Sequence, residues 1–133
     1  MGFENIYNHK AIVKESANAR VNLIGEHTDY TGGYVMPTLL GFKNTIELSK
    51  NEENKFVVFS EHFNEKKIFN DFIKSQSNDW SDYIKGCLFV FFDDTKNKIR
   101  HFYIYISSSI PLERGISSFS CIMRFYFKSY KFL

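Results

Sequence analysis

The sequence predicts an α+β domain in which a sheet fills the first half and a helix follows it. Three observations lead to this class. Short runs rich in β-branched and aromatic residues, such as Lys55–Ser60, are separated by polar turns and are typical of strands. An apolar stripe at helical spacing begins at Trp80. The length of 133 residues fits a single domain, because domains usually hold roughly 100–200 residues.

The expected strands share extended, apolar-rich sequences bounded by turn residues. The first expected strand is Ala11–Ile24, and it is followed by a loop that starts at Gly25. In chain order the further extended segments are Tyr34–Pro37, Thr45–Leu48, Lys55–Ser60, the short and edge-like Lys66–Phe69, and His101–Ile106. A polar turn, Asn51–Asn54, separates Thr45–Leu48 from Lys55–Ser60.

The helix is predicted from residues that recur at positions i, i+3, i+4, i+7 and i+8. These residues are Trp80, Tyr83, Ile84, Cys87 and Leu88. Asp79 stands where a capping residue is expected for the first turn. Near the end of the chain, the serine-rich loop Ser107–Ser120 is expected to open a second helix.

Composition excludes several classes of protein. The 17 basic and 15 acidic residues give a net charge of +2, which is too balanced to predict a nucleic-acid or membrane partner. No apolar run reaches the roughly 18 residues that a membrane span needs, and the first residues hold no apolar signal segment, so a cytoplasmic location is expected. Cys87 and Cys121 lie far apart and favour free thiols over a zinc site or a disulfide.

The strongest chemical signal is a polar cluster between glycines. Glu26, His27 and Asp29 lie in a segment bounded by Gly25 and by the pair that begins at Gly32. Carboxylates accept hydrogen bonds from hydroxyls and an imidazole can donate or accept, which suits recognition of a sugar. On residue types alone, a solvated loop is the alternative to such a site.

The surrounding stretch, ARVNLIGEHTDYTGGYVMP at residues 19–37, resembles the galactose signature of the galactokinases, members of the GHMP small-molecule kinase superfamily. The signature in that family looks like GRxNLIGEHTDYNGGxVLP. Ala19, Thr31 and Met36 are mild departures from it. The resemblance implies the N-terminal domain of the GHMP kinase fold, which is similar to a ribosomal-protein fold and would be incomplete in this chain.

The resemblance also implies roles for residues of the signature. Glu26, His27, Thr28 and Asp29 would bind D-galactose. Arg20 would act as the catalytic cation that stabilises negative charge during phosphoryl transfer from ATP in the presence of Mg²⁺. Without the resemblance, a surface ion pair is the simpler interpretation of Arg20.

Two further segments resemble nucleotide-binding parts of the family. Ser60, in FVVFSEHF, matches a position that contacts nucleotide, and DWSDYIKG is similar to the family's W-x-x-Y-[IV]-K-G helix. The resemblance would place Trp80 and Tyr83 near the adenine. Plain core packing is the alternative for both rings.

The segment 111–120 is similar to the family's phosphate loop, PxGAGLSSSAS, but it departs at functional positions. Gly115, Ile116, Ser117 and Ser118 would contribute to nucleotide binding through loop amides and hydroxyls. Glu113 and Arg114 replace small residues, and Phe119 stands at the position of the serine that holds magnesium. Phe119 has no oxygen for a metal, so no metal ligand is predicted in this chain.

The expected organisation is a galactokinase-like domain at residues 1–120 followed by an atypical tail at 121–133. Because the family's catalytic aspartate and C-terminal lobe lie beyond residue 133, the chain is expected to be a truncated galactokinase that is inactive alone, and a separate chain that supplies the missing lobe stays open. The first alternative is a non-catalytic galactose-binding or regulatory module. The second is a fold remnant with affinity for RNA, suggested by the basic and aromatic tail.

Overall fold

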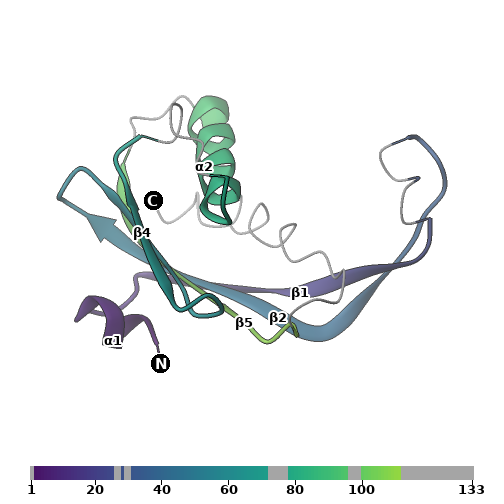
Figure 1. Cartoon of the computed structure of the whole chain (residues 1–133), viewed down its shortest axis with the longest axis horizontal. Helices are drawn as coiled ribbons and strands as arrows, with labels where there is room; N and C mark the ends of the chain where they lie inside the picture. The colour runs from purple at the N-terminus through teal and green to yellow at the C-terminus, as the bar shows by residue number, and fades with distance from the viewer. Residues whose placement is uncertain (1, 26–27, 29–30, 72–77, 96–99, 112–133) are drawn as a thin grey trace.

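The computed structural model describes residues 2–25, 28, 31–71, 78–95 and 100–111. In this part of the chain, a five-stranded sheet has the order β1-β2-β5-β3-β4, with helices on both faces (Figure 1). The α+β class is confirmed. The elements in chain order are α1 (Phe3–Tyr7), β1 (Val13–Ile24), β2 (Met36–Asn51), β3 (Phe56–Ser60), β4 (Glu65–Phe69), α2 (Ser81–Thr95) and β5 (His101–Ser108).

All the strands expected from the sequence are present, but two of the expected segments belong to a single strand, β2. The segments Tyr34–Pro37 and Thr45–Leu48 were expected as separate pieces, whereas β2 is continuous over 16 residues. Pro37 does not interrupt β2, because the ladder there joins β2 only to β1 and leaves one edge without a strand partner among the described residues. The edge position expected for Lys66–Phe69 is correct, since β4 ends the sheet.

The direction of the strands brings three of their ends together. Strand β5 runs parallel to β3 and antiparallel to β2, and β2 runs antiparallel to β1. Strands β1, β3 and β5 therefore share one direction. Their carboxyl ends, at Ile24, Ser60 and Ser108, point toward the same edge of the sheet. This edge holds the starts of the loops to which the sequence assigned sugar, nucleotide and phosphate binding.

The main core lies between the sheet and α2. Side chains alternate along a strand, so Val58 and Ile104 face α2 while their neighbours face away. Ile84 and Leu88 of α2 are almost completely buried against them. The full set of buried residues in this core is Val13, Ile46, Leu48, Phe56, Val58, Phe69, Ile84, Leu88, Phe92, Phe102 and Ile104.

The prediction that Tyr83 belongs to the buried stripe of the helix was wrong, because its side chain is 58% exposed. At 3.6 residues per turn, Tyr83 lies about 140° around the helix from Leu88, which is at the centre of the buried face. The stripe is therefore narrower than the sequence pattern suggested. Trp80 and Cys87 lie at its border, half-buried against the core.

The start of α2 was predicted correctly. The Asp79 carboxylate accepts a hydrogen bond of 2.8 Å from the backbone N–H of Ser81, which satisfies one of the free N–H groups of the first turn. Asp82 reaches back and accepts the N–H of Asn78 at 2.8 Å. No helix within the described residues has the length and hydropathy needed to span a membrane.

The opposite face of the sheet is covered by α1, an element that the sequence analysis missed. Phe3 is buried against Phe59 and Tyr105, and the Tyr7 hydroxyl can donate to the carbonyl oxygens of Val57, at 3.1 Å, and Ile104, at 2.8 Å. The signal was the spacing of Phe3, Ile6 and Tyr7, but five residues are too few to predict a helix without its tertiary contacts.

We predict that Leu88→Ala lowers the free energy of unfolding by about 2–5 kcal/mol, because it removes a fully buried side chain and leaves a cavity between α2 and the sheet. Urea titration monitored by circular dichroism measures the change. The matched control is Val90→Ala on the same helix, where the side chain is 41% exposed, and a change below about 1 kcal/mol is expected there. Equal effects of the two variants would contradict this packing of α2.

Candidate functional site

The distal parts of β1 and β2 form a two-stranded arm, defined here as residues 18–43. Within the described residues, this part of β2 pairs with β1 alone, and the arm projects beyond the rest of the sheet (Figure 1). The described residues of the sugar signature, residues 19–37, lie on the arm. The large exposed apolar residues of the arm are Leu23, Ile24, Tyr34, Val35, Met36, Leu39 and Phe42.

The turn at the tip of the arm is built around Thr28. Its hydroxyl can donate to the carbonyl oxygens of Gly25, at 3.1 Å, and Tyr34, at 2.9 Å, and its own carbonyl accepts the N–H of Gly33 at 2.8 Å. These contacts tie the two sides of the turn together. The hydroxyl of Thr28 thus supports the turn, and its assignment as a galactose contact stays a prediction.

The turn requires glycines, because its backbone conformation and tight packing leave no room for a side chain. Gly25 has φ of +89° and Gly32 has φ of +80°, the region in which side chains are disfavoured. At Gly25, a Cβ would lie 2.5 Å from the Tyr34 carbonyl oxygen, and at Gly33 it would lie 2.6 Å from the Cβ of Thr28. The tight, glycine-bounded turn expected from the sequence is confirmed.

Two polar groups next to the turn are buried and have no hydrogen-bond partner within the described chain. They are Nε of Arg20 and Oδ1 of Asn22. Because the two residues are separated by one position in a regular stretch of β1, their side chains leave the same face of the arm. Buried polar groups are normally paired, so this pair marks a place where a ligand group would be favoured.

Asn22 was not among the residues predicted from the sequence. The available signal was its position, two residues after Arg20 in a strand that enters the polar turn. Glu26, His27 and Asp29, the expected sugar-binding residues, lie outside the described residues. The structure does describe Gly25, Thr28 and Thr31, which are close to them in the sequence and are joined by hydrogen bonds within the turn.

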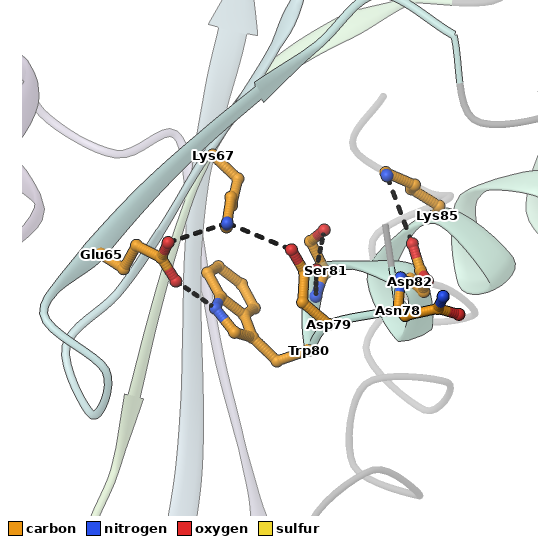
Figure 2. Close-up of polar contacts among 8 residues, drawn as sticks. All are labelled: Glu65, Lys67, Asn78, Asp79, Trp80, Ser81, Asp82 and Lys85. Atoms are coloured by element: carbon orange, nitrogen blue, oxygen red, sulfur yellow. Dashed lines mark hydrogen bonds and ion pairs between the residues drawn. The ribbon is translucent and has the colours of Figure 1, made fainter. Parts of the chain in front are cut away.

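Two of the expected nucleotide-binding residues, Ser60 and Trp80, lie on either side of Glu65, at the β3–β4 hairpin. Ser60 is buried at the end of β3 and pairs with Glu65 across the β3–β4 hairpin. Glu65 in turn accepts a hydrogen bond of 2.8 Å from the indole Nε1 of Trp80 (Figure 2). Ser60 and Trp80 are thus joined through Glu65, a residue that sequence reasoning missed. Tyr83 projects into solvent one helical turn further on.

A chain of charges links this hairpin to the start of α2. The Lys67 ammonium lies 2.8 Å from Glu65 Oε1 and 3.1 Å from Asp79 Oδ2 (Figure 2). A hydrogen bond from the Ser81 side chain, and with it the Lys67 ammonium, holds the pKa of Asp79 at about 2. Hydrogen bonds from Lys67 and Trp80 lower the pKa of Glu65. Both carboxylates are therefore charged at neutral pH and fix the position of Trp80 relative to α2.

The residues assigned to phosphate binding, Gly115, Ile116, Ser117 and Ser118, lie outside the described residues, as do Phe119 and the tail 121–133. The described residues contain no group of three or more His, Cys, Asp or Glu side chains that could hold a metal ion. Cys87 is a free thiol, and burial raises its pKa.

Comparison with known proteins connects the arm to a family. Residues 1–50 match the profile described as the galactokinase galactose-binding signature. The chain is similar to the N-terminal part of galactokinases. The galactokinase of Pyrococcus furiosus is 43% identical over 99 residues, which are 74% of this chain and 27% of that protein. The galactokinase of Fusobacterium nucleatum is 34% identical over 125 residues, or 90% of this chain and 32% of that protein.

The solved structures agree with this similarity. The crystal structure of Lactococcus lactis galactokinase complexed with galactose superposes with a TM-score of 0.75 and 30% identity, covering 93% of this chain and 33% of that one. The Methanococcus jannaschii mevalonate kinase superposes with a TM-score of 0.74 at 20% identity, which shows the shared GHMP kinase fold alone. The chain therefore spans about a third of the length of the galactokinases it matches.

We predict that Gly25→Ala opens the tip of the arm, because the backbone strain at positive φ alone amounts to about 1–3 kcal/mol and the new Cβ meets a carbonyl oxygen. Hydrogen exchange of the Gly33 amide, which donates to Thr28, reports the opening as faster exchange. Gly41→Ala is the control, since no atom lies within 4 Å of a Cβ there. Unchanged exchange in Gly25→Ala would show that the turn has another shape.

We also predict a pH-dependent stability difference between the wild type and Asp79→Asn. The folded pKa of Asp79, about 2, lies below its ordinary value of 3.8, so its charge stabilises the fold above pH 3.8. This stabilisation is lost as pH falls through about 2. Urea titrations from pH 7 to pH 2 should show a difference that decreases as the pH falls below 3.8 and is smallest at the acidic end. Asp93→Asn, an exposed position on α2, serves as control, and the same acid-sensitive step there would refute the assignment.

Proposed function

We propose that this chain supplies the sugar-recognition arm and the catalytic guanidinium of a galactokinase. The reaction transfers the γ-phosphoryl group of ATP to the anomeric hydroxyl of D-galactose and gives galactose 1-phosphate. The observation that carries the proposal is the buried, unpartnered pair of Arg20 Nε and Asn22 Oδ1 at the base of the signature turn. The relative crystallised with galactose supports the choice of sugar.

The chemistry fits the residues of the arm. Phosphoryl transfer is catalysed mainly by positioning and by cations placed where charge accumulates. Arg20 has a fixed fork of donors whose Nε is not used by the described protein, so it is available for a phosphoryl or sugar oxygen. The Asn22 oxygen can accept a hydrogen bond from a sugar hydroxyl. Glu26, His27 and Asp29 of the signature would bind the other hydroxyls, while the Thr28 hydroxyl supports the turn.

The nucleotide and its metal ion would bind near the carboxyl end of β3 and the start of α2, away from the tip of the arm. Ser60, Trp80 and Tyr83 would contact ATP, and the loop with Gly115 to Ser118 would contribute amides to its phosphates. Mg²⁺, when bound, neutralises phosphate charge. Phe119 has no atom to coordinate it, so this chain does not supply the metal ligand expected at that position and no step of the proposal depends on one. A cytoplasmic location is part of the same proposal.

The exposed apolar surface of the arm favours a further polypeptide in the active enzyme. A two-stranded ribbon is marginally stable by itself, and contiguous exposed apolar residues usually mark an interface. Among the described residues of the arm, seven large apolar side chains are exposed, including Leu39 at 66% and Tyr34 at 100%. We propose that the part corresponding to the remaining two-thirds of a galactokinase packs against this surface.

A second candidate function is a non-catalytic galactose-binding module. It is favoured by one observation, the contrast between a sugar signature with three mild changes and a phosphate loop in which Glu113, Arg114 and Phe119 replace functional positions. Galactose binding without product formation would support this candidate.

The proposal predicts that the full chain, mixed with the purified C-terminal two-thirds of the Fusobacterium nucleatum galactokinase, forms galactose 1-phosphate from galactose and ATP. Arg20→Lys keeps the charge but loses the fork and should lower the rate by about a hundredfold. A coupled assay for ADP release measures the rate, and galactose 1-phosphate is verified by mass spectrometry.

Two controls make this test decisive. The chain alone, and the C-terminal fragment alone, should form no galactose 1-phosphate. Lys43→Arg, a charge-preserving change at an exposed position at the base of the arm, should leave the rate unchanged. If the mixture stays inactive while isothermal calorimetry detects galactose binding to the full chain, the binding module replaces the kinase as the assigned function.

A further inference from the structure

The ladder between β1 and β2 changes register at the root of the arm. It is regular as far as Asn18, which pairs with Lys43. The next pair joins Arg20 to Leu39, so a single residue of β1 lies opposite residues 40–42 of β2. Bulges of this kind bend a strand and increase its twist, and they are frequent beside active sites because they change the direction of a side chain. The direction of the arm is therefore set at this bulge.

A second irregularity lies beyond the functional pair of the arm. The register shifts again between Asn22 and Ile24. Arg20 and Asn22 thus lie in a short regular stretch between two irregularities. The buried groups proposed to meet the substrates, Arg20 Nε and Asn22 Oδ1, both belong to this stretch. Because the stretch follows directly on the bulge, the bend at the root of the arm decides where these two groups are placed.

The bulge is held by side chains from both of its neighbouring strands. The Asn18 amide Nδ2 donates to the carbonyl oxygen of Leu40 at 2.8 Å. Ser109, directly after β5, accepts the backbone N–H of Lys43 on its Oγ at 2.8 Å and donates its own N–H to the Lys43 carbonyl at 2.9 Å. These contacts use only the backbone of Lys43. Ala19, opposite the bulge, is 0% exposed, so the root is packed and fastened at both ends of the bulge.

The bulge separates the two halves of the proposed site. The arm carries Arg20 and the sugar signature, whereas Ser60 and Trp80, proposed to contact the nucleotide, belong to the rest of the domain. Beyond Lys43, the described part of β2 pairs with β1 alone (Figure 1). The bend at the root therefore sets the place of the guanidinium relative to the nucleotide. Such placement matters for the rate, because a shift of about 1 Å can slow a reaction about a hundredfold.

We propose that Asn18 and Ser109 are positioning residues for phosphoryl transfer, which fix the bend of the arm and through it the place of Arg20 relative to the nucleotide. The inference rests on the proposed function, because it gives both residues a part in that same reaction. Neither side chain touches a substrate in this proposal. Since the galactose contacts proposed for this chain all lie on the arm and move with it, the two residues act on kcat and not on galactose binding.

The experiment uses the full chain mixed with the C-terminal two-thirds of the Fusobacterium nucleatum galactokinase. Asn18→Asp keeps the shape of the side chain but replaces the donating amide by a carboxylate, which the Leu40 carbonyl repels. We expect kcat to fall about tenfold or more, with the KM for galactose within about twofold of the wild type. Ser109→Ala should have the same effect. Ser109→Thr keeps the hydroxyl and should restore the wild-type kcat.

A matched control and a measurement without catalysis complete the test. Ser16→Ala removes a hydrogen bond to Thr45 between the same two strands, but in the regular part of the ladder, so its kcat should equal that of the wild type. In the full chain alone, nuclear magnetic resonance follows the Nε–H of Arg20, which is identified by its loss in Arg20→Lys. Asn18→Asp and Ser109→Ala should shift this signal and speed its exchange with solvent, whereas Ser16→Ala should not.

The outcomes distinguish this inference from the proposed function. An unchanged kcat in Asn18→Asp and Ser109→Ala overturns the inference and leaves the kinase proposal standing, as does a raised galactose KM with unchanged kcat. If the wild-type mixture is inactive, the kinase proposal fails. The Arg20 signal then decides, because a shift in both variants supports the bracing of Arg20 and an unmoved signal overturns it. Circular dichroism checks folding, and if Asn18→Asp does not fold, the comparison of Ser109→Ala with Ser109→Thr gives the result.

Discussion

The parallel pairing of β3 with β5 is the constraint on which the arrangement of the candidate site depends. These strands lie far apart in the sequence, and α2 connects the hairpin that follows β3 to β5 by crossing one face of the sheet. The crossing buries Ile84 and Leu88 and makes the carboxyl ends of β1, β3 and β5 coincide at one edge. If β5 paired in the opposite direction, the segment after Ser108 would leave from the other edge, away from Ser60 and from the arm.

The arm and the rest of the domain, called the body here, are stabilised by different interactions. The body has helices on both faces, and its strands hold buried residues such as Val58 and Tyr105 on alternating sides. The arm has a ladder but few buried apolar side chains, so its order depends on the turn at its tip, where Thr28 ties the two strands together. An arm of this kind gains stability from a partner surface, because its apolar side chains are exposed and Arg20 Nε has no partner in the described chain.

The candidate nucleotide region shows how charged contacts can hold aromatic side chains in place. Individually, exposed ion pairs such as Glu65 with Lys67 contribute little to stability, about 0–1 kcal/mol. Here their effect is geometric, since they fix the indole of Trp80, on which the ring of Phe63 stacks. The carboxylates that do this have lowered pKa values, so the arrangement persists throughout the neutral range.

The sequence by itself determined the features that depend on neighbouring residues. The strands β1, β3, β4 and β5, the cap at Asp79 and the glycine-bounded turn follow from alternation, hydrogen-bonding side chains and backbone freedom, all of which act over a few positions. The signature also indicated the family to which the chain is similar. Only the tertiary structure decided that β2 is continuous through Pro37, that Tyr83 faces solvent, that α1 docks on the sheet, and that Glu65 and Phe63 meet Trp80. Each of these features depends on which distant strand or helix packs beside it. The same local sequence pattern is compatible with many pairings of apolar segments, and burial of the core stabilises only one of them.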